Sequence, residues 1–132
     1  MESITVRSSK RNELIDINRE VVDIVSKSGI KDGICNIYAP HATCGIIINE
    51  NYDPNICLDV IDLLKEHIPQ GKWRHDSIDN NADAHIKAAI VGPSETIPVS
   101  EGRLVMGTWQ SIMLADFDGP RERTILVSVI KS

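Results

Sequence analysis

The chain has 132 residues, a length that suits one domain (residues 1–132) with a sizeable core. Its apolar fraction of 42% and charged fraction of 25% are ordinary for a globular protein, and its net charge of −5 argues against an extended nucleic-acid-binding surface. No apolar stretch reaches the length of a membrane span, and the N-terminus lacks the features of a signal peptide, so we expect a cytoplasmic protein without membrane partners. Three cysteines, an odd number, fit reduced thiols better than a disulfide framework.

The sequence of the first half of the chain predicts four strands and one helix. Apolar runs separated by polar turns predict strands at 4–8, 14–17, 33–38 and 43–49. Residues 18–28 carry an apolar stripe at helical spacing, with Asn18 as the expected N-cap and Gly29 as the end.

The second half begins with a helix that Asp53 caps, with Pro54 at its first position and Pro69 at its end. A polar loop over 70–81 precedes a short helix at 82–91. Strands are then expected at 96–99, 103–106, 109–117 and 124–130. Strands at both ends with helices between predict an α+β fold, in which antiparallel or mixed β-sheets pack against two to three helices.

Polar side chains crowd both ends of the strand at 43–49. His41, Thr43 and Cys44 precede its apolar run, whereas Asn49 and Glu50 follow it. Because a buried strand holds the side chains at its two ends in fixed positions, both ends of this strand are candidate sites. Thr43 and Asn49 are the candidate substrate contacts there.

Three histidines stand in different elements: His41 before the strand, His75 in the polar loop and His85 in the short helix. Imidazoles from separate elements can converge on one divalent metal, and zinc suits such ligands in a cytosolic protein. The alternative is that each is a solvated or hydrogen-bonded histidine. His67, near a helix C-terminus, is expected to be structural.

Cys44 is a candidate nucleophile if a histidine lowers its pKa, and a small buried side chain otherwise. Glu50 and Asp59 are candidate general bases, or residues that orient a metal-bound histidine. The alternative for both carboxylates is helix capping or solvation.

The C-terminal half offers groups that could hold a phosphorylated ligand. Thr108, Trp109 and Gln110 follow Gly107 and offer a hydroxyl, a stacking face and an amide, or else form a β-bulge with a core tryptophan. Arg121 and Arg123 could hold a phosphate, or form solvated salt bridges with Glu122. Ser94 lies in a Gly-Pro-Ser-Glu turn that could present backbone amides to an anion.

These segments together resemble the YjbQ-like family, also called the secondary thiamine-phosphate synthase family. The resemblance runs nearly end to end in matching order and spacing. Its residues are Pro40-His41-Ala42-Thr43, Ile48-Asn49-Glu50-Asn51, Asp53-Pro54, Asp59, His75, Ala84-His85-Ile86, Gly92-Pro93-Ser94, Ile97-Pro98-Val99, Gly102-Arg103-Leu104, Gly107-Thr108-Trp109-Gln110-Ser111-Ile112 and Asp118-Gly119-Pro120-Arg121-Glu122-Arg123. Departures are Ala42, Met106 and Ala115, where the family often has threonine, leucine and glutamate.

The resemblance implies a compact α+β homotrimer with a pocket near the subunit boundaries and a metal on His41, His75 and His85. It also implies a low-level thiamine-phosphate synthase activity, in which an aminopyrimidine diphosphate joins a thiazole phosphate and pyrophosphate leaves. Two other functions stay open from the residues: a non-catalytic trimeric module that binds a metal or small anion, and a metal-dependent hydrolase.

Overall fold

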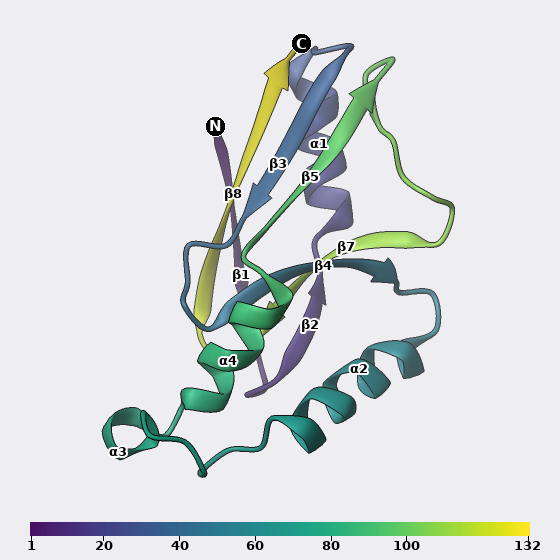
Figure 1. Ribbon diagram of the computed structural model, residues 1–132. Helices are drawn as coiled ribbons and strands as arrows, with labels where there is room; N and C mark the ends of the chain where they lie inside the picture. Colours follow the sequence, from purple (N-terminus) through teal and green to yellow (C-terminus); the bar gives the residue numbers. More distant parts are fainter.

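The computed structural model describes all residues, 1–132, and arranges the strands in two antiparallel sheets (Figure 1). The larger sheet has the order β1-β8-β3-β5-β6, and the smaller has the order β2-β7-β4. The strands of the larger sheet are β1 (Glu2–Arg7), β8 (Glu122–Lys131), β3 (Gly33–Tyr38), β5 (Ser94–Ser100) and β6 (Arg103–Leu104). Those of the smaller sheet are β2 (Glu13–Asp16), β7 (Gln110–Asp116) and β4 (Cys44–Glu50).

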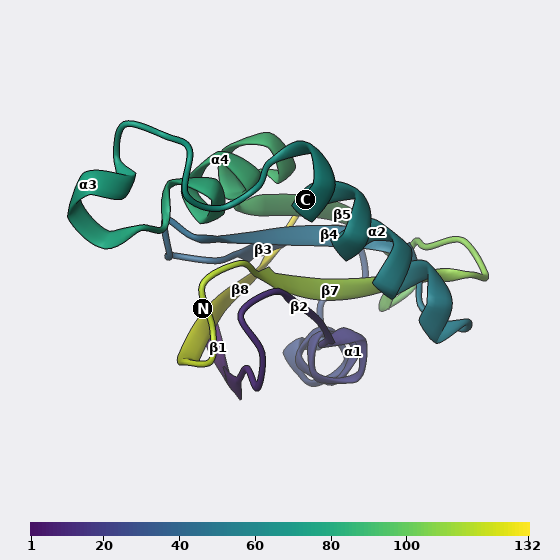
Figure 2. The same cartoon turned by 90° about the horizontal axis from the view of Figure 1, so that it is seen from below.

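Four helices complete the fold: α1 (Asn18–Ser28), α2 (Pro54–His67), α3 (Asp76–Asp79) and α4 (Ala82–Val91). Figure 2 shows α2 and α4 on one side of β4 and β7, with α1 on the other side. None of the helices combines the length and the apolar character that crossing a lipid bilayer requires.

The main core lies between the two sheets and α1. Val21 and Val25 of α1 pack there with Ile37 of β3, Ile46 of β4 and Leu114 of β7, and all five are almost fully buried. Side chains of a strand alternate between its faces, so one face of each sheet supplies this core.

A second apolar cluster holds α4 and α2 against the other face of the smaller sheet. Ala84 and Ala88 of α4 pack there with Ala115 and Phe117. Gly45 lets α4 approach closely, because a Cβ on it would lie 2.5 Å from Val91 Cγ1 and 2.9 Å from the Gly92 carbonyl oxygen.

No helix covers the outer face of the larger sheet, since α1 lies behind β3 and β5 in Figure 1. Ile34, Tyr38 and Ile130 stand on this face with 42%, 41% and 53% of their surface exposed. Ile34 pairs with Ile130 across β3 and β8, so these apolar side chains are neighbours.

The α+β class and the antiparallel pairing are confirmed, and the helices at 18–28 and 82–91 have the expected bounds. Asp53 caps α2 as predicted, since its carboxylate accepts from the Asn55 N–H at 2.9 Å. The cap at Asn18 is wrong: Ile17 occupies the N-cap, and the Asn18 side chain accepts from the Ile112 N–H at 3.2 Å instead. The loop expected at 70–81 contains the additional short helix α3.

Candidate functional site

The far end of β4 brings together several of the residues predicted to contact substrate. Glu50 is in register with Gln110 of β7, and Glu50 Oε2 accepts from the Asp53 N–H at 3.3 Å. Trp109 is 62% exposed and meets the Tyr52 ring edge-on, with ring centroids 5.5 Å apart. The alternative of a core tryptophan is therefore wrong, and this end of the sheet presents two exposed aromatic rings.

Of the other polar residues predicted to form the site, some bond within the protein and others are exposed to solvent. The Gln110 Oε1 atom accepts from the Gly107 N–H at 2.8 Å, which holds the turn before β7. Asn49 and Thr108 are exposed, as is Asp59 on α2. At the far side of the fold, Ser94 Oγ accepts from the Asn36 amide at 2.8 Å.

The start of β4 holds a buried polar network centred on Asp116. The Arg123 guanidinium donates to both carboxylate oxygens of Asp116, from Nε at 3.0 Å and from Nη2 at 2.8 Å. Ser8 Oγ donates to the same carboxylate at 2.7 Å, and Arg123 Nη2 also donates to Thr43 Oγ1 at 3.0 Å. Although burial opposes ionisation, the bonds from Arg123 and Ser8 hold the pKa of Asp116 below its ordinary value.

Cys44 belongs to the same network, where its environment disfavours the thiolate. Its Sγ lies 3.7 Å from Asp116 Oδ1, and the residue is 1% exposed. Burial, followed by the Asp116 charge, raises the pKa of the Cys44 thiol to about 12. A nucleophilic cysteine needs a shift in the opposite direction.

The two arginines predicted to share a phosphate lie in different environments. The Arg123 side chain is 7% exposed and paired with Asp116, whereas that of Arg121 is 59% exposed. Arg121 Nε donates to the Asp118 carbonyl oxygen at 3.0 Å, and its Nη2 lies 3.5 Å from the Asp118 carboxylate. The aspartates are therefore the ion-pair partners, and the expected pairing with Glu122 is not formed.

His41 contacts the backbone of β8 in the larger sheet. Its Nε2 lies 3.0 Å from the Thr124 backbone N and 3.1 Å from the Thr124 carbonyl oxygen. The pairing of β3 with β8 ends at Tyr38 and Leu126, so the imidazole takes the place that a longer β3 would fill beside Thr124. The tautomer decides whether Nε2 accepts from the N–H or donates to the carbonyl oxygen.

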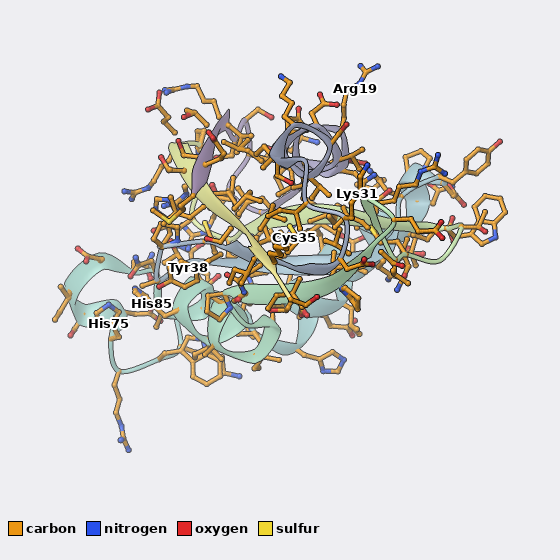
Figure 3. All side chains as sticks on the ribbon, turned by 90° about the horizontal axis from the view of Figure 1, so that it is seen from above. Arg19, Lys31, Cys35, Tyr38, His75 and His85 are labelled. Carbon is orange, nitrogen blue, oxygen red and sulfur yellow. The ribbon has the colours of Figure 1, made fainter.

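His75 and His85 come together at the corner between α3 and α4, as Figure 3 shows. Their ring centroids lie 5.0 Å apart, with the ring planes at 85°. They line a surface hollow of about 720 Å³ that also contains Lys72 and Arg74 but no acidic residue. The remaining lining residues are Trp73, Ala82 and Ile86.

The predicted convergence of His41, His75 and His85 is not formed in one chain. No group of three histidine, cysteine or acidic side chains has the geometry to hold a metal ion. His75 and His85 lie side by side as an edge-to-face pair, whereas Nε2 of His41 is engaged by Thr124.

Glu50 stands far from this corner. β4 has seven residues, which at about 3.4 Å per residue separate its ends by roughly 20 Å. In Figures 1 and 2, α3 lies beyond the start of β4, whereas Glu50 stands at its other end. Glu50 and the two histidines therefore do not face one substrate from the same chain.

The sequence reasoning overlooked a second buried network under α4. Asp83 and Lys87 are each 1% exposed, and Lys87 Nζ donates to Asp83 Oδ2 at 2.9 Å. Arg11 Nη2 donates to the other oxygen of Asp83 at 3.0 Å. The sequence could have indicated this pair, because Asp83 and Lys87 lie one helical turn apart in a helix otherwise rich in alanine and isoleucine.

The sequence matches the family described as "UPF0047 protein YjbQ-like" over residues 2–132. The chain belongs to this YjbQ-like family. A UPF0047 protein of Methanocaldococcus jannaschii is 46% identical over 125 residues, covering 95% of this chain and 90% of the relative. The UPF0047 protein YugU of Bacillus subtilis is 40% identical over 133 residues, covering 98% of both chains.

Solved structures share the YjbQ-like fold. A YbjQ-like protein of unknown function from Sulfolobus solfataricus superposes with a TM-score of 0.96 at 43% identity, covering 99% of this chain and 96% of the other. A YjbQ/UPF0047 family protein from Clostridium acetobutylicum superposes with a TM-score of 0.94 at 38% identity, covering 98% and 100%. The fold is thus shared along the whole chain, and the function has to be argued from the site.

Proposed function

We propose that this YjbQ-like protein is a metal-binding enzyme that acts on a small phosphorylated substrate at the α3–α4 corner. The observation that carries the proposal is the meeting of the His75 and His85 rings, 5.0 Å apart, in a hollow. Two imidazoles on one tetrahedral zinc ion place their ring centroids roughly 5 Å apart, given zinc–nitrogen bonds of about 2.0–2.1 Å. The spacing of this pair therefore suits a shared divalent ion, with zinc preferred.

The charges around the histidines support an anionic substrate. Lys72 and Arg74 line the hollow, whereas the Asp76 carboxylate beside His75 is engaged by the Trp73 N–H at 2.8 Å and the Ala82 N–H at 3.0 Å. These two cations stand closer to the proposed reaction than Arg121 and Arg123, which are engaged by Asp118 and Asp116. A bound zinc ion would supply further positive charge to the leaving oxygens of the substrate.

The reaction that we propose is a weak thiamine-phosphate synthase activity, as the family resemblance implies. Lys72 and Arg74 would bind the diphosphate of the aminopyrimidine and stabilise the pyrophosphate as it leaves. The Trp73 ring would stand beside the substrate, held in place by its Nε1–H, which donates to the Pro69 carbonyl oxygen at 2.7 Å. Glu50 and Trp109 would serve this substrate only from a neighbouring subunit, because they lie at the other end of β4.

We also propose a homotrimer that covers the outer face of the larger sheet. Ile34 and Ile130 form an exposed apolar pair on this face, Tyr38 stands beyond Asn36 on the same face, and no helix covers them. Light scattering should report three chains per particle for the wild type and smaller particles for Tyr38→Glu. A wild-type monomer would contradict the trimer and leave the histidine site to one chain.

A non-catalytic module that binds a metal or small anion is the second candidate, favoured by the separation of Glu50 from the histidines. The two candidates differ in turnover, so the test is pyrophosphate release from an aminopyrimidine diphosphate and a thiazole phosphate. We expect His85→Ala and Arg74→Gln to lose release, and His67→Ala, with its histidine exposed on α2, to keep it. No release by the wild type, or equal release by His85→Ala, would contradict the enzyme.

A further inference from the structure

A second cationic hollow lies against α4, on the face away from the histidines. Asp83 and Lys87 are four positions apart and share one face of the helix, whereas His85 points in nearly the opposite direction at about 100° per residue. The hollow encloses about 450 Å³ between α4, the end of α2 and the loop that joins β1 to β2. It is separate from the hollow that His75 and His85 line.

A buried lysine stands at the base of this hollow. Lys87 is 1% exposed, and its Nζ donates to Asn12 Oδ1 at 3.1 Å and to Asp83 Oδ2 at 2.9 Å. Its Nζ also lies 6.0 Å from the centroid of the Phe117 ring, so this ammonium group already has partners within the protein.

The positive charge of the hollow exceeds its negative charge. Lys10, Arg11, Lys65 and Lys87 line it, and Asp83 is its one acidic residue. Asp83 is shared between Lys87 and Arg11, and Asp118 lies 3.4 Å from Arg11 as a second carboxylate. Lys10 and Lys65 form no ion pair in the structure.

This local excess stands out because the whole chain carries a net charge of −5. The two unpaired lysines, Lys10 and Lys65, leave a local excess of positive charge that attracts a compact multivalent anion, and their ammonium groups suit phosphate oxygens. The volume lies within the ordinary range for small-molecule sites, about 300–1,000 Å³.

We infer that the hollow formed by Lys10, Arg11, Lys65 and Lys87 is a binding site for a phosphate or diphosphate group. It is separate from the proposed metal site and does not rest on the proposed reaction. Its ligand is a small phosphorylated molecule, whose phosphate is bound by Lys10 and Lys65 at the rim, above the paired Arg11 and Lys87 at the base.

The test is calorimetric titration of metal-free, chelator-treated protein with inorganic pyrophosphate, and in parallel with orthophosphate. The site variant combines Lys10→Gln with Lys65→Gln, because both side chains are exposed and their loss should not unfold the protein. The control combines Arg19→Gln with Lys27→Gln on α1, which removes the same charge away from the hollow.

We expect the site variant to weaken pyrophosphate binding at least tenfold, roughly the loss of one charge-assisted hydrogen bond, and the control to change it less than about twofold. Backbone amide resonances of Arg11, Asn12 and Lys87 should shift on titration. Equal weakening in both variants would show general charge attraction, and no binding by the wild type would exclude the site.

A third variant separates this inference from the proposed function. If Lys72→Gln with Arg74→Gln abolishes pyrophosphate binding while the site variant keeps it, the anion occupies the histidine hollow. That result would overturn the second site and support the proposed enzyme. Loss of metal binding in His85→Ala with unchanged pyrophosphate affinity would support both.

Discussion

Replacing Asp116 by Asn should lower the free energy of unfolding by about 3–5 kcal/mol. This is a large share of the total unfolding free energy of a typical domain, about 5–15 kcal/mol. The Asp116 carboxylate accepts two bonds from Arg123, one from Ser8 and one from the Asp118 N–H. Arg123 is only 7% exposed, so the variant leaves a buried guanidinium without its counter-charge. An amide also turns two N–H donors toward Arg123 donors.

The assay is urea unfolding followed by circular dichroism. With an m-value of about 2 kcal/mol per M, a loss of about 4 kcal/mol lowers the midpoint by about 2 M. Asp59→Asn is the matched control, because Asp59 is exposed on α2 and its change should stay within about 0.5 kcal/mol. Adding Arg123→Met to Asp116→Asn removes the buried guanidinium that has lost its counter-charge, and it should recover part of the lost unfolding free energy.

The same pair predicts a pH dependence. The pKa of Asp116 lies below its ordinary value in the folded protein, so its stabilising contribution is present above the unfolded-state pKa, about 3.9. That contribution is lost as the pH falls through the folded-state pKa. The difference in unfolding free energy between wild type and Asp116→Asn should therefore shrink below about pH 4. A loss under about 1 kcal/mol at pH 7, or a gap that widens in acid, would refute the reasoning.

Three further predictions concern the neighbours of this network. His41→Ala should lose about 1–3 kcal/mol in urea unfolding, because a Thr124 backbone group loses its partner; an unchanged midpoint would mean that water replaces the imidazole. Gly45→Ala should lower the free energy of unfolding by about 1–3 kcal/mol, because the new Cβ would clash with Val91. Adding Val91→Ala to this variant should restore part of the loss, and an equal loss in the single and the double variant would mean that the clash with Val91 is not its cause. Cys44, with a pKa of about 12, should resist iodoacetamide at pH 8 until the chain is denatured, and fast native labelling by mass spectrometry would contradict its burial.

The sequence predicted the elements well where glycine and proline mark their ends. Gly29 and Gly92 stop α1 and α4 at the expected residues, and Asp53 with Pro54 starts α2. The helix α3 was missed because it has only four residues, one of them apolar (Ile78), which is too short to show a helical period.

The site was predicted less completely, because it depends on which groups face each other across the fold. Of the three histidines predicted to converge, only His75 and His85 meet, because the backbone group that an imidazole such as His41 faces cannot be read from spacing. Arg123 was expected to bind phosphate, and the turn between β7 and β8 instead returns it to Asp116. β7 and β8 belong to different sheets, so this ion pair depends on how the two sheets pack, which the periodicity of each strand does not determine.

Metal content per subunit tests the central claim most directly. It is measured by inductively coupled plasma mass spectrometry on untagged protein, purified without added metal, for wild type, His85→Ala and His67→Ala. The account predicts near-stoichiometric zinc or another divalent ion in the wild type and His67→Ala, and its loss in His85→Ala. No metal in any of the three, or equal metal in all three, would contradict a site on His75 and His85.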